Sequence, residues 1–254
     1  VYVTTIGKAI KENALSSRLE KREVFKGGVW AAAAHVSGFC AQVDIMRGSK
    51  IMWNSRLVDS IYLRKLFVTH ELRENDEDSK DHDIGSYDLV IITDFGHGTL
   101  TKELIARVTK EARFLAVNAQ TNATNFGFNL ITKYSRADLA VIDEPEARLA
   151  VQDRSSPIES VMRKLRDGRF TRLIVTHGSH GSYGIDEAGR FSHAAAFTDT
   201  VKDTMGAGDA FLAIVSPLAA AGAPMDYLLR AGNAAGAIKC GIVGHRESVT
   251  KDKL

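Results

Sequence analysis

Short apolar runs alternate with helical patterns from residue 88 onward, and this alternation limits the folds that are open to the chain. The runs are rich in Val and Ile and are apolar on both faces, as strands inside a parallel sheet are. Repeated strand–helix units imply right-handed crossovers, so the sequence predicts an α/β fold with a doubly wound, mainly parallel sheet flanked by helices. The predicted strands are 88–93, 114–118, 139–143 and 173–178, and the predicted helices are 101–112, 156–166, 207–221 and 226–240.

The first 75 residues show a different pattern, in which polar and apolar residues alternate as they do in half-exposed strands. This pattern predicts a small sheet with strands in about 1–25 and 50–72, which we expect to project from the main body as a lid. A helix entered through the pair Gly27 and Gly28 is predicted between these strands. Such a sheet exposes an apolar face, which commonly packs against a ligand or a second subunit. The acidic run 71–83 is expected to form a solvated loop.

Composition narrows the classes of partner. With 254 residues, 44% of them hydrophobic, the chain is long enough for one large α/β domain with a substantial core. Its formal charge of +2 predicts neither a nucleic-acid nor a membrane partner. No apolar run reaches the roughly 18 residues that span a bilayer. Cys40 and Cys240 do not make a disulfide framework, and the first residues lack the order of a signal peptide, so we expect a cytoplasmic protein.

A glycine-rich turn between two acids carries the clearest chemical signal. It lies in the string DTMGAGDAF, from Asp203 to Phe211, and Gly206 to Gly208 are expected at the N-terminus of an alanine-rich helix. Backbone N–H groups there have no partner within the helix, and the dipole favours negative charge, so the turn is suited to hold a phosphate. Asp209 in this turn would repel a phosphate, so its presence there indicates a second role. In that role it accepts the proton of a hydroxyl that attacks the phosphate. A capped helix with a glycine-rich entry is the alternative.

The same string resembles the second signature of the PfkB, or ribokinase-like, sugar kinases, which reads D-T-x-G-A-G-D-x-F, and it matches every specified position. The resemblance implies a single ribokinase-like domain over residues 1–254 that uses ATP and Mg²⁺ to phosphorylate a sugar or sugar phosphate. It also implies that Asp209 is the catalytic base and that Gly206, Ala207 and Gly208 form the anion hole. An activating monovalent cation is a further option in this family.

The segment VTHGSHG resembles the T-x-G-x-x-G turn of the family. The resemblance implies that Thr176, Gly178 and Gly181 line the phosphates of ATP. A β-turn between two strands is the alternative, and both descriptions can hold together. His177 and His180 are expected at the surface rather than on zinc, because no second Cys or His pair accompanies them.

Two further segments resemble nucleotide-binding elements of the family. IDEPEARLA resembles the N-x-x-E element, which implies that Glu146 organises Mg²⁺ through water. Asp143 stands where the family usually has Asn, at the nucleotide phosphates. Helix-start acids that complement the dipole are the alternative for this pair. AGNAAGAIKC resembles the penultimate helix of the family and implies that Asn233 borders the adenine pocket, whereas small residues on a helix more often indicate close packing.

The sugar side matches the family less completely. Gly27 and Gly28 match its first signature, which implies that the backbone approaches the sugar there, but the Asn expected shortly afterwards is missing. DLVIITDFGHG resembles the heptose-phosphate kinases and implies that Asp94 contacts the substrate, whereas VNAQTNATNFGFN departs from their D-P-K string. The opening strand of the family is expected before Val1, so we expect the chain to be a fragment. The connection at Met46–Arg47 is also short for the family.

These resemblances together predict an ATP-dependent kinase that acts on a hydroxyl of a sugar or sugar phosphate, with a substrate like a heptose phosphate. A kinase for a ketose, a pentose or a nucleoside is the alternative within the enzyme class. A kinase-like binding protein without turnover is the alternative outside it, although the intact Asp209 argues against that alternative. A homodimer that forms through the lid sheet is also predicted.

Overall fold

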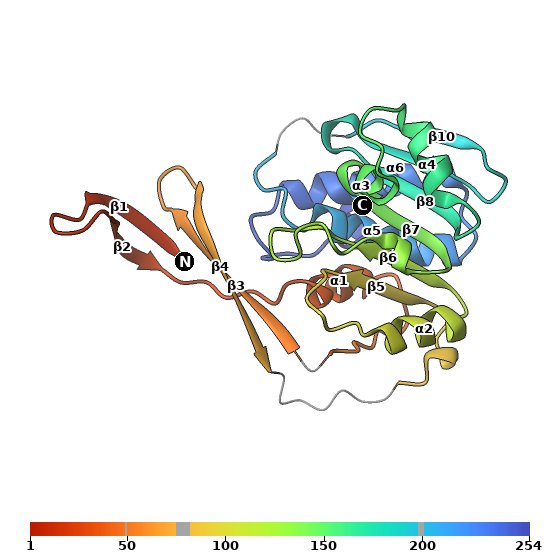
Figure 1. Ribbon diagram of the computed structural model, residues 1–254, viewed down its shortest axis with the longest axis horizontal. Helices are drawn as coiled ribbons and strands as arrows, with labels where there is room; N and C mark the ends of the chain where they lie inside the picture. Colours follow the sequence, from red (N-terminus) through yellow and green to blue (C-terminus); the bar gives the residue numbers. More distant parts are fainter. Residues whose placement is uncertain (49, 75–81, 198–200) are drawn as a thin grey trace. The chain divides into compact units, whose positions relative to one another are not determined.

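The computed structural model describes residues 1–48, 50–74, 82–197 and 201–254. The chain divides into two compact units. The smaller unit comprises Val1–Phe25 and Arg47–Ser79, and the larger comprises Lys26–Met46 and Lys80–Leu254. Each unit contains a sheet of its own (Figure 1).

The sheet of the larger unit has six strands in the order β10-β9-β8-β7-β6-β5. Strands β5 to β8 run parallel, and β9 and β10 extend the sheet as antiparallel strands. This arrangement confirms the predicted mainly parallel sheet, with strand ends that differ from the predicted ones by at most three residues. The strands are β5 Val90–Asp94, β6 Leu115–Ala119, β7 Ala137–Asp143, β8 Phe170–Thr176, β9 Ser182–Ile185 and β10 Phe191–Ala194.

Helices cover both faces of this sheet (Figure 1). Ile142 and Val175 point to the face that also buries α2, α3 and α4, whereas Val141 and Ile174 point to the face that buries α5 and α6. This alternation is the period of two that a strand imposes on its side chains. The helices are α1 Val29–Val36, α2 Lys102–Glu111, α3 Glu144–Val151, α4 Ile158–Arg166, α5 Ala207–Ala220 and α6 Met225–Cys240.

Local signals fix where the helices begin and continue. Thr101 caps α2, because its hydroxyl oxygen accepts a hydrogen bond from the Leu104 amide at 3.2 Å. Helix α5 continues through Pro217, within the predicted helix 207–221. Within the described ranges, every helix is too short or too polar to cross a lipid bilayer. Among its described residues, the larger unit also contains four short 3₁₀ turns: η1 Ile84–Ser86, η2 Ile131–Lys133, η3 Gly178–His180 and η4 Lys251–Lys253.

The smaller unit is a four-stranded sheet in the order β2-β1-β3-β4. Its central pair β1–β3 is parallel, and the two outer pairs are antiparallel. Every residue of β2 and β4 is exposed within the chain, so neither strand shows the alternate burial expected of half-exposed strands, and the role of this sheet as a lid stays a prediction. The strands are β1 Tyr2–Lys8, β2 Leu15–Lys21, β3 Lys50–Asp59 and β4 Lys65–Glu74.

The predicted acidic loop 71–83 needs a correction at its start. Residues 71–74 are the end of β4, where Glu71 pairs with Trp53 across the antiparallel ladder. Backbone pairing with β3 therefore outweighs the polar composition that suggested a loop. The remainder of this acidic run up to residue 81 lies outside the described residues.

Helices α5 and α6 approach each other closely at Gly232. A Cβ atom added there would lie 2.4 Å from the Phe211 ring, and Phe211 is only 3% exposed. We therefore expect Gly232→Ala to lower the free energy of unfolding by about 1–3 kcal/mol through overpacking. Urea denaturation measures this change.

Gly236 provides the matched control on the same helix. The nearest atom to a Cβ added there is the Ala207 carbonyl oxygen, at 4.0 Å. Gly236→Ala should therefore leave stability unchanged or raise it by about 1 kcal/mol, because alanine has the higher helix propensity. Equal stabilities of the two variants would contradict the packing account.

Candidate active site

The carboxyl ends of the parallel strands bring the polar candidates to one edge of the sheet. Asp94 at the end of β5 pairs with Ala119 at the end of β6, so Gln120 follows directly at that edge. Asp143 at the end of β7 pairs with Thr176 at the end of β8. In open α/β sheets this edge is where ligands bind.

The predicted glycine turn forms the N-terminus of α5. Gly206 is its N-cap residue and has φ 78°, in the left-handed region that glycine adopts without strain. The Ala207 amide donates to the Thr204 carbonyl at 3.3 Å, whereas Gly208 is exposed in the first turn. The positive end of the helix dipole thus lies at this turn, as the sequence predicts.

Asp209 in the first turn of α5 is a buried carboxylate. It is 7% exposed, and its Oδ1 atom accepts a hydrogen bond from Gln120 Nε2 at 3.0 Å. Burial raises the pKa of Asp209 to about 6, although the Gln120 hydrogen bond and the Lys239 charge act in the opposite direction. Burial therefore outweighs the stabilisation of the ionised form that the helix position predicts. An acid with a pKa near neutral is suited to accept a proton.

Asp203, the first acid of the motif, anchors the turn. Its Oδ1 atom accepts from the Met205 amide at 3.1 Å, and its Oδ2 atom accepts from the Gly244 amide at 3.0 Å. The Asp203 amide in turn donates to the Cys240 carbonyl at 3.1 Å. These bonds tie the start of α5 to the chain that leaves α6.

His245 lies beside two of the predicted glycine sites. A Cβ atom added to Gly206 would lie 3.1 Å from its Cε1 atom, and one added to Gly27 would lie 3.3 Å from its Nε2 atom. Gly28, the N-cap residue of α1, has φ 57°, and a Cβ there would lie 3.2 Å from the Phe95 ring. The structure therefore brings Gly27 and Gly206 to the same histidine.

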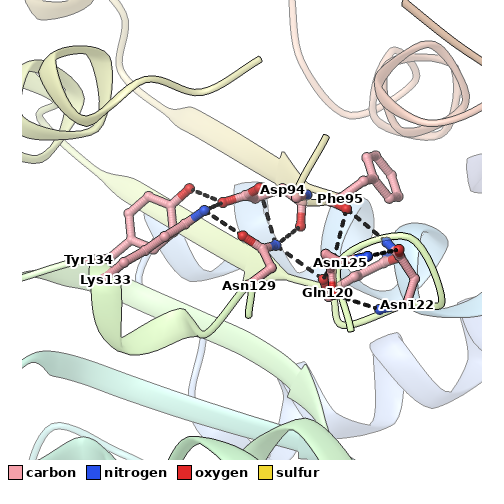
Figure 2. Close-up of polar contacts among 9 residues, drawn as sticks. Asp94, Phe95, Gln120, Asn122, Asn125, Asn129, Lys133 and Tyr134 are labelled. Atoms are coloured by element: carbon pink, nitrogen blue, oxygen red, sulfur yellow. Dashed lines mark hydrogen bonds and ion pairs between the residues drawn. The ribbon is translucent and has the colours of Figure 1, made fainter. Parts of the chain in front are cut away.

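Asp94 is committed to contacts within the protein (Figure 2). Its side chain is buried, and Oδ2 accepts from the Tyr134 hydroxyl at 2.7 Å and forms an ion pair with Lys133. Oδ1 accepts from the Gly96 amide at 3.0 Å. Both carboxylate oxygens thus have protein partners, which gives Asp94 a structural role. Its predicted contact with a substrate stays a prediction.

The segment after β6 holds Gln120 in place (Figure 2). The Gln120 amide donates to the Asp94 carbonyl at 2.8 Å. The Gln120 carbonyl accepts from Asn125 Nδ2 and from Asn129 Nδ2, both at 3.0 Å. With its backbone fixed in this way, Gln120 extends its side chain to Asp209. Sequence reasoning missed Gln120, and the asparagine-rich string after a buried strand was the available signal, because asparagine side chains commonly bond nearby backbone groups.

Asp143 and Glu146 form a capping box at the start of α3. The Glu146 amide donates to Asp143 Oδ1 at 2.9 Å, and the Asp143 amide donates to Glu146 Oε2 at 3.2 Å. The other Glu146 oxygen, Oε1, accepts from the Thr121 amide at 2.8 Å. Burial and then the neighbouring Asp143 raise the pKa of Glu146 to about 7. Asp143 and Glu146 are therefore acids at the start of a helix, which was the alternative to a nucleotide-binding role.

This pair of carboxylates also limits how a metal ion could bind. No cluster of three or more His, Cys, Asp or Glu side chains suited to a metal ion occurs among the residues that the structure describes. Asp143 and Glu146 therefore do not form a complete protein cage. A Mg²⁺ ion commonly keeps several of its waters when it binds next to phosphates, so it would need only one or two such carboxylates.

The segment between β8 and β9 forms the predicted turn. The His177 amide donates to the Gly181 carbonyl at 2.8 Å, and His177 pairs with Glu144 at 2.7 Å. Gly181 has φ 87°, and a Cβ there would lie 2.0 Å from the Ala194 carbonyl oxygen, so only glycine fits. His180 is exposed, in agreement with the expected surface position.

Thr176 and Asn233 bond to backbone carbonyls near this turn. The Thr176 hydroxyl donates to the Ile142 carbonyl at 3.4 Å. The side-chain Nδ2 atom of Asn233 donates to the carbonyls of Ala194 and Ala195, both at 2.9 Å. Asn233 therefore fixes the chain that leaves β10. The nucleotide contacts predicted for these two residues, and for Gly178 and Gly181, stay predictions.

Comparisons with known proteins agree with this architecture. A family model described as pfkB family carbohydrate kinase matches residues 66–252. The bifunctional protein HldE of Nitrobacter hamburgensis is 32% identical over 165 residues, which is 62% of this chain and 32% of that protein. The chain thus spans about a third of the length of the curated relatives that it matches.

Two solved structures illustrate the shared fold. Phosphofructokinase-2 from Escherichia coli in complex with potassium has a TM-score of 0.69 at 17% identity, over 99% of this chain and 92% of that one. Arabidopsis thaliana ribokinase complexed with ribose and ATP has a TM-score of 0.57 at 16% identity, over 75% and 63%. At these identities the likeness shows the ribokinase-like fold, which confirms the predicted fold class.

The raised pKa of Asp209 predicts a pH-dependent cost to stability. Its pKa is about 6 in the folded protein and 3.8 for an ordinary Asp, so the folded state binds the proton more tightly. Stability due to this group is therefore lost as the pH rises from about 4 to about 6. We expect Asp209→Asn to be more stable than the wild type near pH 8, on the order of 1–3 kcal/mol, and equal near pH 4. Denaturant unfolding across this pH range measures the difference.

Asp226 supplies the control for this experiment. It is an exposed acid in the first turn of α6, as Asp209 is a buried acid in the first turn of α5. Asp226→Asn should leave the pH profile of stability unchanged. An Asp209→Asn protein that is no more stable than the wild type near pH 8 would show that burial does not disfavour the ionised carboxylate.

Proposed function

Because the chain belongs to the PfkB family of carbohydrate kinases, we propose that it transfers the γ-phosphoryl group of ATP to a hydroxyl of a sugar phosphate similar to a heptose phosphate. The observation that carries this proposal is Asp209, buried in the first turn of α5, where its pKa is raised to about 6. A base of this kind beside a helix N-terminus combines proton acceptance with anion binding.

Asp209 is the proposed general base. It would accept the proton of the acceptor hydroxyl while that oxygen attacks the γ-phosphorus atom and the bond to ADP breaks. Gln120 would hold the carboxylate through its bond to Oδ1, so that the other oxygen faces the hydroxyl. The turn formed by Gly206, Ala207 and Gly208 would stabilise the charge on the transferred phosphoryl group through the helix N-terminus.

ATP is the proposed co-substrate. Its phosphates would lie at the turn that contains Thr176, Gly178 and Gly181, at the carboxyl ends of β7 and β8. The adenine would lie near Asn233. Support comes from the motifs and from the ribokinase neighbour, which was solved complexed with ribose and ATP.

Mg²⁺ is the proposed metal ion, and Asp143 and Glu146 would hold it through its waters. When bound, it would offset the negative charge of the phosphate oxygens. The phosphofructokinase-2 neighbour was solved in complex with potassium, so a monovalent cation is a candidate cofactor as well. Whether this chain needs a monovalent cation depends on the residues around the turn 206–208.

The relative HldE supports a heptose phosphate as the acceptor class, on the basis of 32% identity over part of both chains. The sugar would bind near Gly27 and Gly28, and Gly27 lies beside the same histidine as Gly206. Ketoses, pentoses and nucleosides are the other acceptors to compare. A kinase-like protein without turnover is the second candidate, and the missing sugar-site Asn favours it.

An acceptor panel tests the proposal. Protein, ATP and Mg²⁺ are incubated with heptose phosphates, fructose 6-phosphate, ribose and a nucleoside, and ADP release is measured. We expect the highest kcat/KM with a heptose phosphate. ATP binding without ADP release on any acceptor would favour the binding protein instead, and a higher kcat/KM on another sugar would reassign the substrate.

The role of Asp209 predicts a separation of turnover from nucleotide binding. Asp209→Asn keeps the shape of the side chain but removes the base, so kcat should fall by about 10²–10⁴-fold while the Kd for ATP changes little. Steady-state kinetics and calorimetry measure the two quantities. Asp226→Asn, in the first turn of the neighbouring helix, is the control with unchanged kcat. Loss of ATP binding with turnover intact would contradict the assignment.

The exposed sheet of the smaller unit is the proposed dimer interface. Leu57 and Phe67 lie opposite each other across β3 and β4, and Phe67 is 54% exposed. We expect light scattering at micromolar concentration to give twice the 27.7 kDa chain mass, and Phe67→Lys to give the monomer mass. Lys11→Glu, in the turn between β1 and β2, should remain dimeric. A monomeric wild type would exclude this interface.

A further inference from the structure

Lys239, in the last turn of α6, is completely buried, with an exposed fraction of 0%. Lysine is almost never fully buried unless its ammonium group has partners, because removing the charge from water is costly. No step of the proposed reaction uses this side chain. Its burial therefore calls for a different explanation.

The Lys239 ammonium faces backbone oxygens. Its Nζ donates to the Gly244 carbonyl at 2.7 Å and approaches the Ile242 carbonyl at 3.5 Å. Both carbonyls belong to the chain that leaves α6. The Gly244 amide also donates a hydrogen bond to Asp203, the first acid of the turn. The Lys239 ammonium and Asp203 therefore both hold this segment.

Acidic groups around Lys239 oppose the effect of its burial. Burial lowers the pKa of its ammonium, whereas Asp203, the Cys240 thiol and Asp209 act against that decrease. Burial, with Lys239 and His245 beside it, lowers the pKa of His35 to about 4, so His35 is neutral near pH 7. Of these two groups, the lysine rather than His35 is thus the one suited to carry a positive charge beside the turn.

The position of Lys239 connects it to the anion hole. A Cβ atom added to Gly206 would lie 3.3 Å from Lys239 Cε, so the side chain packs directly against the N-cap residue of α5. The Lys239 charge also acts on Asp209, whose pKa it lowers. A set of backbone carbonyls together with a carboxylate is the kind of oxygen environment that holds a monovalent cation.

We propose that the Lys239 ammonium is a built-in cation, which holds the turn 203–208 against residues 242–244 and makes an added monovalent cation unnecessary. Lys239 is a positioning residue, because it supports Gly206 and Asp203 rather than the reacting atoms. The consequence for turnover rests on the proposed kinase function. The consequence for folding does not, because the contacts of the ammonium are made without substrate.

The first test measures the wild-type protein in chloride salts of potassium, sodium or tetramethylammonium at constant ionic strength. Tetramethylammonium is too large and lacks N–H donors, so it cannot replace an ammonium group. We expect the same thermal unfolding midpoint and the same kcat in all three salts. A midpoint or kcat that rises specifically with potassium would overturn the proposal.

The second test compares two substitutions of the lysine. Lys239→Ala removes the ammonium and leaves space beside the carbonyls, whereas Lys239→Met removes the charge but fills the space. We expect both variants to unfold about 5 °C or more below the wild type. Potassium or methylammonium should restore the alanine variant in a saturable manner, and should not restore the methionine variant.

The readouts separate the new inference from the proposed function. Rescue of the unfolding midpoint needs no turnover, so it decides the role of Lys239 even if no acceptor is found. Where turnover is measured, kcat of Lys239→Ala should fall about tenfold or more and return with potassium. Lys110→Ala, an exposed lysine in the last turn of α2, is the control with no cation effect.

Two outcomes would contradict the built-in cation. A folded Lys239→Ala protein that responds to neither potassium nor methylammonium would make Lys239 an ordinary buried side chain. Equal rescue of Lys239→Met would place the cation effect elsewhere in the molecule. If the alanine variant does not fold, the wild-type salt comparison decides the question by itself.

Discussion

The burial of the Asp209 carboxylate at the N-terminus of α5 is the constraint that the rest of the site accommodates. A buried negative charge is unfavourable unless donors and positive charges compensate it. Gln120 donates a hydrogen bond to it, Lys239 lies close enough to lower its pKa, and the helix dipole points its positive end toward it. Two of these partners are held in place by further contacts. The asparagines after β6 hold Gln120, and the chain that leaves α6 holds Lys239.

The sequence indicates those parts of the structure that local patterns determine. Val and Ile runs predict the strands β5 to β8 because strands buried on both faces have no polar alternation. Thr101 predicts the start of α2 because its hydroxyl replaces a missing backbone partner. The glycines of the motif at 203–211 predict a helix N-terminus, and Gly206 does adopt a backbone angle that favours glycine. In all three cases the cause lies within a few residues of the effect.

The remaining contacts depend on residues far apart in the chain. Gln120 and Asp209 are separated by 89 positions, so no local pattern could pair them. Asp94 follows a strand as a substrate-binding acid would, but Lys133 and Tyr134 occupy its Oδ2 atom, and this becomes visible only once η2 is placed beside β5. The sequence does not indicate the burial of Lys239 either, because a lysine at the end of a helix is normally exposed and complements the dipole.

The asparagine-rich segment between Gln120 and Asn129 has a consequence for how such a protein can adapt. It fixes Gln120 through backbone bonds, and Gln120 in turn lowers the pKa of Asp209. Substitutions at Asn125 or Asn129 would therefore change the pKa of Asp209 through the position of Gln120. The acidity of this carboxylate thus depends on a stretch of the chain that is remote from it in sequence.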